Sequence, residues 1–248
     1  EREAADTGDA GQRFAAKPHG RDIREIIIAG GRGAELGRCV TLDGEREIAG
    51  PHADAVVKNE KGLLDYLERL RAQFPRRPVL VQEFLTGAEY SVQLIGNPDQ
   101  GLRALPILEV DYSRLDDKLP KILGYESKWL PDSPYWTQIK YREATLSDQK
   151  QQQMIDSSSR LFERLGCRDY ARFDFRADAK GEIKLLEVNP NPGWCWDGKM
   201  NIMAGFQGMR YSELLGQILL AAVERLGITA KPAAAQAGTN GNHAVAAE

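Results

Sequence analysis

Four polar side chains between residues 168 and 193 have the types and spacing of a site for a divalent cation and an anion: Arg172, Asp174, Glu187 and Asn189. Residues two apart share one face of a β-strand, as Arg172 and Asp174 would, and as Glu187 and Asn189 would. Mg²⁺ prefers carboxylate and amide oxygens and completes its octahedron with water or substrate phosphates. We therefore expect Asp174, Glu187 and Asn189 to hold Mg²⁺, with Arg172 beside them to meet an anion.

The segment around these residues reads as a β-hairpin. A turn centred on residues 180 and 181 would pair Asp174 with Glu187 and Arg172 with Asn189. Opposed carboxylates have Cβ atoms about 5 Å apart and repel unless a cation lies between them. On the other face, the same register pairs apolar residues: Phe173 with Val188, and Phe175 with Leu186.

An ordinary amphipathic hairpin with a solvated polar face is the alternative interpretation. The second strand, however, runs directly into Asn189-Pro190-Asn191-Pro192-Gly193. Such a turn lacks donors at its prolines and fixes the chain direction where the ligands end. This turn favours the metal site.

The pattern RFDF…LLEVNPNPG resembles the nucleotide and metal site of the ATP-grasp superfamily, in its D-alanine:D-alanine ligase branch. The resemblance implies ATP and Mg²⁺ as cofactors, with Mn²⁺ as a substitute. Asp174, Glu187 and Asn189 would be the metal ligands. Arg172 would be catalytic, stabilising the phosphoryl and tetrahedral transition states.

Residues 77–96 read as two apolar, β-branched strands joined at Thr86-Gly87. Any hairpin could look like this, but the segment also resembles the family's interdomain hinge. The resemblance implies that Glu89 binds the ribose, because a carboxylate accepts hydrogen bonds from two hydroxyls. The residues that would border adenine are Gln82, Glu83, Phe84 and Leu85.

Two lysines complete the nucleotide set implied by the resemblance. Lys17 matches a strand lysine that reaches the α- and β-phosphates, and Lys128 matches a catalytic loop lysine at the γ-phosphate. Most lysines are simply exposed. The assignment of these two therefore depends on their order along the chain relative to the hinge and the hairpin. Pro131 and Pro134 indicate an irregular loop that could cover the phosphates.

The elements that must position these residues alternate between helices and strand-rich segments. We expect helices at 60–73, 147–166 and 211–226, and strands near 102–111 and 135–141. The core-facing residues of the first two helices would be Leu63, Leu64, Leu67, Leu70, Ile155, Phe162 and Leu165.

This order predicts an α+β architecture. The resemblance specifies it as an ATP-grasp fold, in which two α+β lobes clasp ATP between antiparallel sheets. We expect a small lobe at 13–86, with the strand lysine and a glycine-rich hairpin, and a large lobe at 87–228 with the metal site. Residues 1–12 and 229–248 have the composition of disordered ends.

The glycines of residues 25–37 are spaced somewhat like a dinucleotide-binding fingerprint. Only Arg38 separates them from the next strand-like run, 39–42, so no helix remains to hold a pyrophosphate. The remaining interpretation is a hairpin whose glycine-rich tip lies over the ATP phosphates. Which residues of 19–52 form the phosphate loop stays open.

Composition narrows the class of partner. The net charge of −3 gives no basic face for nucleic acid, and no apolar run approaches the about 18 residues of a membrane span. Three cysteines without a zinc or disulfide pattern favour a reducing, cytoplasmic setting. We expect small-molecule carboxylate and amine substrates and a missing N-terminal domain of the same protein, while a homodimer remains open.

The acceptor segment departs from the family. Its D-alanine members carry a Met-Thr pair and then a serine, where this chain has Trp194-Cys195-Trp196-Asp197-Gly198-Lys199. We expect Gly193, Trp194, Trp196 and Lys199 to contact a substrate other than D-alanine, although tryptophans are more often core residues.

Two functions follow from the resemblance. One is an ATP-dependent carboxylate-amine ligase that works through an acyl phosphate. The alternative is a non-catalytic ATP-grasp module that binds nucleotide and regulates or scaffolds a partner.

Overall fold

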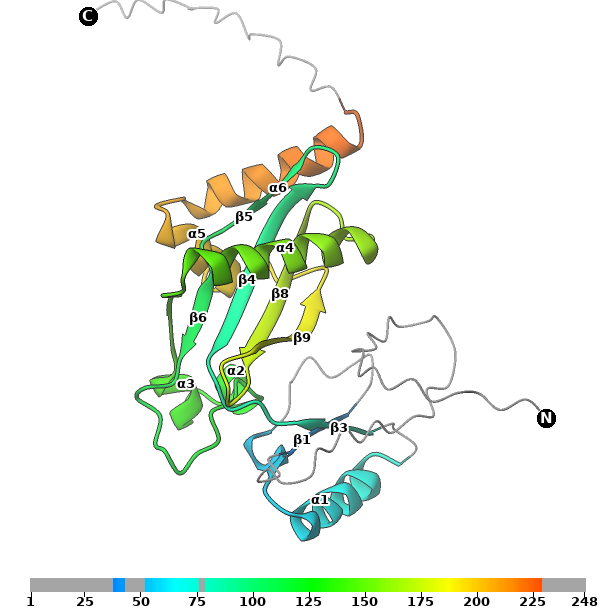
Figure 1. The fold of residues 1–248 in the computed structure, drawn as a ribbon, viewed down its shortest axis with the longest axis vertical. Helices are drawn as coiled ribbons and strands as arrows, with labels where there is room; N and C mark the ends of the chain where they lie inside the picture. The colour runs from blue at the N-terminus through cyan, green and yellow to red at the C-terminus, as the bar shows by residue number, and fades with distance from the viewer. Residues whose placement is uncertain (1–37, 43–51, 76–78, 229–248) are drawn as a thin grey trace, which may run out of the picture.

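The computed structural model describes residues 38–42, 52–75 and 79–228, which form two β-sheets with their helices (Figure 1). The first and last predicted segments, 1–12 and 229–248, lie outside these residues, as do the glycine-rich hairpin and Lys17. None of the helices in the described part of the chain is long and apolar enough to cross a membrane.

The smaller sheet has the strand order β2-β1-β3 and packs against one helix. Its elements are β1 (Arg38–Leu42), η1 (Ala53–Ala55), β2 (Val56–Val57), α1 (Glu60–Gln73) and β3 (Val79–Glu83). Helix α1 begins where the Asn59 side chain accepts a hydrogen bond from the Gly62 N–H, which satisfies a free donor of the first turn.

The predicted inner face of α1 is partly wrong. Tyr66 and Leu70 are buried, and Leu63 and Leu67 pack at the edge of the same core, but Leu64 is 58% exposed. Residues 66 and 70 define the centre of the buried stripe, and at about 100° per residue, residue 64 lies about 140° from that centre around the helix. The small lobe therefore has a narrower apolar face than its leucines suggested.

The larger sheet is antiparallel, with the order β7-β6-β4-β8-β9 and β5 paired to β4. Its strands are β4 (Glu89–Asn97), β5 (Gly101–Ala104), β6 (Leu108–Asp111), β7 (Lys140–Glu143), β8 (Tyr170–Ala177) and β9 (Ile183–Asn189). Strand β4 is central and buried at nearly every position. Both sides of this central strand are therefore covered by other parts of the protein.

Two expected strands differ in the structure. Residues 102–111 form two strands, β5 and β6, rather than one. Residues 135–141 begin as helix α3 (Pro134–Gln138), and only β7 follows as a strand. The Ser133 side chain accepts from the N–H groups of residues 135 and 136, and Pro134 occupies the first turn, so a local cap overrides the β propensity of this segment.

Helices cover both faces of the larger sheet. Met154 and Phe162 of α4 (Asp148–Arg164) pack with Val92 and Phe173 on one face. On the other face lie α5 (Lys199–Phe206) and α6 (Tyr211–Arg225), whose buried residues pack with Ile95. In Figure 1, α4 crosses strands β4 and β8, and α6 lies against β4, where Asn97 Nδ2 donates to the Ala221 carbonyl.

The ends of α4 and α6 follow the predicted signals. The Ser147 side chain caps α4, while Gly166 and Gly227 follow the two helices with φ of 64° and 62°, in the left-handed region. Leu165, expected to face inward, is 45% exposed because it is the C-terminal cap residue of α4 and lies past the buried stripe.

The β8–β9 hairpin confirms the predicted pairing near the site and corrects it near the turn. Arg172 pairs with Asn189 and Asp174 with Glu187, but Phe175 pairs with Leu185. Leu186 is the extra residue of a β-bulge on β9. The bulge arises because the turn spans 178–182, where the Asp178 side chain accepts from the N–H groups of Lys180 and Glu182.

Candidate functional site

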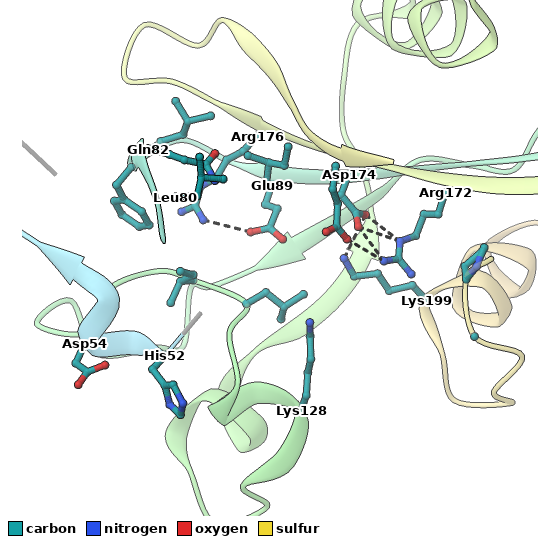
Figure 2. Close-up of a pocket in the computed structure, with 18 of the residues that line it drawn as sticks. His52, Asp54, Leu80, Gln82, Glu89, Lys128, Arg172, Asp174, Arg176 and Lys199 are labelled. Carbon is teal, nitrogen blue, oxygen red and sulfur yellow. Dashed lines mark hydrogen bonds and ion pairs between the residues drawn. The ribbon is translucent and has the colours of Figure 1, made fainter. Parts of the chain in front are cut away.

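A cavity of about 1100 Å³ lies between the two sheets (Figure 2). Phe74 and Leu80 reach it from the small lobe, and Glu89 and Asp174 reach it from the large sheet. Lys128 enters from α2 (Glu126–Trp129), which follows an irregular segment. The two lobes therefore share one site.

The floor of the cavity is a polar face made by neighbouring strands. Alternation places Glu89, Ser91 and Gln93 of β4 on one face, and the register pairs them with Arg176, Asp174 and Arg172 of β8. Tyr90, Val92 and Phe173 point to the opposite, apolar face. Because side chains alternate along each strand, these six polar side chains lie next to one another on the same face of the sheet.

Asp174 is the most strongly held member of this face. It is 5% exposed, and Arg172 donates to both of its oxygens at 2.9–3.0 Å. Ser91 donates to Oδ1 at 2.5 Å, and Lys199 Nζ lies 3.5 Å from the same oxygen. Burial alone would raise the pKa of Asp174, but Lys199, Arg172 and the Ser91 hydroxyl outweigh it and hold that pKa well below its usual range.

Glu187 lies opposite Asp174 and responds in the other direction. Loss of hydration and then the charge of Asp174 raise the pKa of Glu187, while Arg172, whose Nη2 is 3.6 Å from Oε1, works against this. Two adjacent carboxylates with divergent pKa values form a coupled acidic pair. Such a pair is suited to sharing one cation.

Lys128 lies across the cavity from Asp174, as Figure 2 shows. Desolvation lowers the pKa of Lys128, although Glu187 acts to raise it. The ammonium lies among groups that could bind an anion.

The predicted base and ribose residues are brought to one end of the cavity, lined by Gln82, Glu83, Phe84, Leu85 and Glu89. The Glu89 carboxylate is 6% exposed. It accepts a hydrogen bond from Tyr112 Oη at 2.7 Å and one from Arg176 Nη1 at 3.2 Å, both on Oε2.

Part of the predicted substrate set lies at the opposite end of the cavity. Gly193 and Lys199 line that end together with Cys195, whereas Trp194 and Trp196 are 53% and 74% exposed and are not among the residues that line the cavity. The chain reverses in a turn closed by the Gly198 N–H and the Cys195 carbonyl at 3.1 Å. Trp196 occupies the outer corner of that turn, so its ring faces solvent.

Asn189 stands beside the acidic pair at the end of β9, opposite Arg172. Its side-chain oxygen accepts from the Asn191 N–H at 3.0 Å, which leaves one lone pair for another partner. Within the described residues, no group of three or more His, Cys, Asp or Glu side chains could hold a metal. A cation here would rest on two carboxylates and an amide.

Sequence reasoning missed three members of the site: Ser91, Tyr112 and Arg176. Ser91 and Arg176 carry a usable signal, because each lies two residues beyond a predicted site residue on the same strand, Glu89 and Asp174 respectively. Tyr112 comes from the segment after β6 and carried no such signal.

The chain is similar to known proteins over the region just described. The family model described as D-ala D-ala ligase C-terminus matches residues 55–220, more than half of the chain. A D-alanine–D-alanine ligase of Haemophilus influenzae (strain PittEE) is 27% identical over 143 residues, covering 57% of this chain and 42% of the relative. An uncharacterised protein, y4sG, of Sinorhizobium fredii (strain NBRC 101917 / NGR234) is 33% identical over 144 residues, covering 56% and 39%.

Solved structures show the same likeness at lower identity. D-alanyl-alanine synthetase A from Vibrio cholerae gives a TM-score of 0.54 at 22% identity, covering 75% of this chain and 52% of that one. D-alanine–D-alanine ligase from Bacillus anthracis, complexed with ATP, gives 0.51 at 19% identity, covering 69% and 49%. These likenesses confirm the expected fold. The chain spans less than half the length of the curated relatives it matches.

Proposed function

Because the chain belongs to the family described as D-ala D-ala ligase C-terminus, an ATP-grasp family, we propose that it provides the nucleotide and metal site of an ATP-dependent ligase that joins a carboxylate to an amine. The observation that carries the proposal is the placement of Asp174, Glu187 and Arg172 in one cavity with the hinge segment 82–85. A binding site for a nucleotide alone would not need an arginine on the acidic pair.

The residues present fit a magnesium ion. Asp174 and Glu187 are opposed carboxylates, and the charge of Asp174 raises the pKa of Glu187, which a cation between them would reverse. Asn189 would supply the third oxygen. Mg²⁺, or Mn²⁺ in its place, would neutralise phosphate charge. Lys199 now lies against Asp174 and would have to withdraw from Oδ1.

The nucleotide would lie along the cavity from the hinge to the acidic pair. Gln82, Glu83, Phe84 and Leu85 would border the adenine, and Glu89 would bind the ribose. Lys128 would contact the γ-phosphate, because its side chain lies across the cavity from Asp174. Lys17 remains a proposed ligand of the α- and β-phosphates.

The reaction would proceed in two steps. A substrate carboxylate oxygen attacks the γ-phosphorus, ADP leaves, and an acyl phosphate forms. The amine nitrogen then attacks the acyl carbon, phosphate leaves, and the amine loses a proton. Arg172 and Lys128 would be catalytic, because both place positive charge where negative charge develops on the phosphoryl group and the tetrahedral oxyanion.

The second substrate would meet the segment from Gly193 to Lys199. Lys199 is nearly buried, lies at the first turn of α5 and carries a charge that can pair with a carboxylate or phosphate on that substrate. We propose an acceptor that is bulkier than alanine and carries an anionic group. With the tryptophan rings outside the cavity, its apolar part would contact the Cys195 and Met200 side of the wall.

One observation favours the second function, a non-catalytic nucleotide-binding module with a regulatory or scaffolding role. The ammonium of Lys199 and the guanidinium of Arg172 already compensate Asp174, so the site is balanced without a metal. A module of this kind would bind nucleotide without turnover.

Measurement of ADP release by the protein in its full reading frame separates the two. We expect Mg²⁺-dependent ADP release when amino acids and dipeptides are screened, with larger anionic acceptors preferred over D-alanine. ATP binding without ADP release under any acceptor would support the module, and a clear preference for D-alanine would refute the proposed acceptor class.

A further inference from the structure

Arg176 links three segments at the ribose end of the cavity. Its side chain is 4% exposed and lines the cavity. Nη1 donates to Glu89 Oε2 at 3.2 Å, and Nη2 donates to the carbonyl of Lys121. The guanidinium carbon lies 4.9 Å from the centre of the Phe84 ring and 5.6 Å from that of Tyr112.

These contacts fix the orientation of the Glu89 carboxylate. Among the described residues, its two hydrogen bonds both end on Oε2, one from Arg176 and one from Tyr112. Burial and then the charge of Glu89 raise the pKa of Tyr112 well above its ordinary value, so its hydroxyl remains a donor at neutral pH. With Oε2 held by two donors, Oε1 is left to accept from a ligand.

The arrangement is poorly suited to stability alone. Arg176 Nε is buried and has no hydrogen-bond partner within the described part of the chain. An unsatisfied buried donor destabilises a folded protein. An apolar residue of similar volume often serves stability as well as a buried ion pair does. A charged side chain at this position therefore calls for another explanation.

We propose that Arg176 is a positioning residue for nucleotide recognition, and that it sets the preference for an intact ribose. Arg176 donates to Glu89 Oε2 and stacks on Phe84. It therefore connects the hinge, which would border the base, with the carboxylate that would bind the ribose. The preformed carboxylate would bind ribose hydroxyls without first losing rotamer freedom. This proposal rests on the nucleotide-binding role proposed above for the same cavity.

The test compares ATP with 3′-deoxy-ATP, each with Mg²⁺, by isothermal titration calorimetry. Wild-type protein should bind ATP more tightly than 3′-deoxy-ATP. In Arg176→Met, ATP affinity should fall by about tenfold, as expected for losing a charge-assisted hydrogen bond, whereas 3′-deoxy-ATP affinity should change little. The ratio of the two affinities should thus approach one. A merely structural role would weaken both ligands alike.

Matched variants separate the role from a folding defect. Arg142 makes the comparable cross-strand pair with Glu109 at 2.7 Å, but it is 56% exposed and outside the cavity, so Arg142→Met should leave the ratio unchanged. In the Glu89→Gln background, Arg176→Met should have no further effect on the ratio. Arg176→Lys, which keeps the positive charge, should retain part of the wild-type preference for ATP over 3′-deoxy-ATP.

An unchanged ratio in a folded Arg176→Met protein would overturn the inference, as would an equal loss for both nucleotides. Failure of the wild-type protein to bind ATP would instead reject the proposed function on which the inference rests. Circular dichroism and thermal melting of each variant establish that the compared proteins are folded.

Discussion

Asp174 and Glu187 lie directly opposite each other in the β8–β9 ladder, and their pKa values move in opposite directions. Asp174 is held ionised by Lys199, Arg172 and Ser91, whereas the neighbouring charge of Asp174 disfavours the ionised form of Glu187. A divalent cation between them would favour the ionised form of both.

Nucleotide binding should depend on both carboxylates. Asp174→Asn and Glu187→Gln should each weaken Mg-ATP affinity by at least about tenfold in isothermal titration, because each removes a charged ligand. Glu182→Gln, at the exposed turn of the same hairpin, is the control and should have no effect. Unchanged affinity in both site variants would reject the metal assignment.

Arg172 should act on rate more than on binding. Arg172→Ala should leave ATP affinity within a few-fold but lower kcat by about a hundredfold, as loss of a transition-state contact does. Arg142→Ala provides a surface control. Equal losses in binding and rate would make Arg172 a ground-state phosphate ligand.

Lys199 should compete with the cation. Its ammonium donates to Ser91 Oγ at 3.1 Å and lies beside Asp174 Oδ1, so Lys199→Met should strengthen Mn²⁺ binding in electron paramagnetic resonance titrations. The same variant should raise the acceptor KM. Lys184→Met, on β9 but outside the cavity, should change neither. Weaker Mn²⁺ binding in Lys199→Met would contradict the competition.

Gly87 should tolerate no side chain. A Cβ at this position would lie 2.7 Å from the Ala177 carbonyl oxygen and 2.7 Å from the Ala177 Cβ, so Gly87→Ala should destabilise the fold by about 1–3 kcal/mol. Gly216→Ala, inside α6 with open space around it, should stabilise by about 0.5–1 kcal/mol. Urea unfolding measures both, and equal effects would contradict the proposed contact.

The link between α6 and β8 should fail in acid. Two hydrogen bonds from Arg225 to Asp169, at 2.7–2.8 Å, lower the pKa of Asp169. The contribution of ionised Asp169 to stability is therefore fully present above the pKa of aspartate in the unfolded chain, about 3.9. It is lost as the pH falls through the lower pKa that Asp169 has in the folded protein. The melting-temperature difference between wild type and Arg225→Met should be full at pH 7 and shrink below about pH 4. Lys61→Met, which removes an exposed ion pair, should show little difference at either pH.

The sequence indicated the parts of this fold that depend on local periodicity. The bounds of α1 follow from spacing and are confirmed. The pairing of Asp174 with Glu187 is also confirmed, although the turn differs from the expected one and the bulge at Leu186 makes up the difference in register. The sequence could not indicate that Ser133 would cap a helix where aromatic residues favoured a strand, nor that the Asp178 side chain would widen the turn. Those outcomes depend on single hydrogen bonds between side chains and the backbone, which override the local preference of the sequence for a strand or a tighter turn.

Within the site, the sequence indicated the residues that carry a recognisable motif and missed those that support them. Ser91 and Arg176 are paired with Asp174 and Glu89 across β4 and β8, strands about 80 residues apart whose register is set by the whole sheet. The outward rings of Trp194 and Trp196 depend on a turn that composition does not reveal. Contacts between distant segments are therefore where sequence reasoning stopped.

The unpaired Leu186 divides the β8–β9 hairpin into two segments of different phase. On one side of it, Glu187 and Asn189 keep step with Asp174 and Arg172. On the other side, the strands follow the geometry of the turn at 178–182. A bulge of this kind absorbs a change of register, so an altered turn need not shift the carboxylates. The hairpin tip is thus a suitable insertion point for a fluorophore or peptide tag that reports on the site without disturbing it.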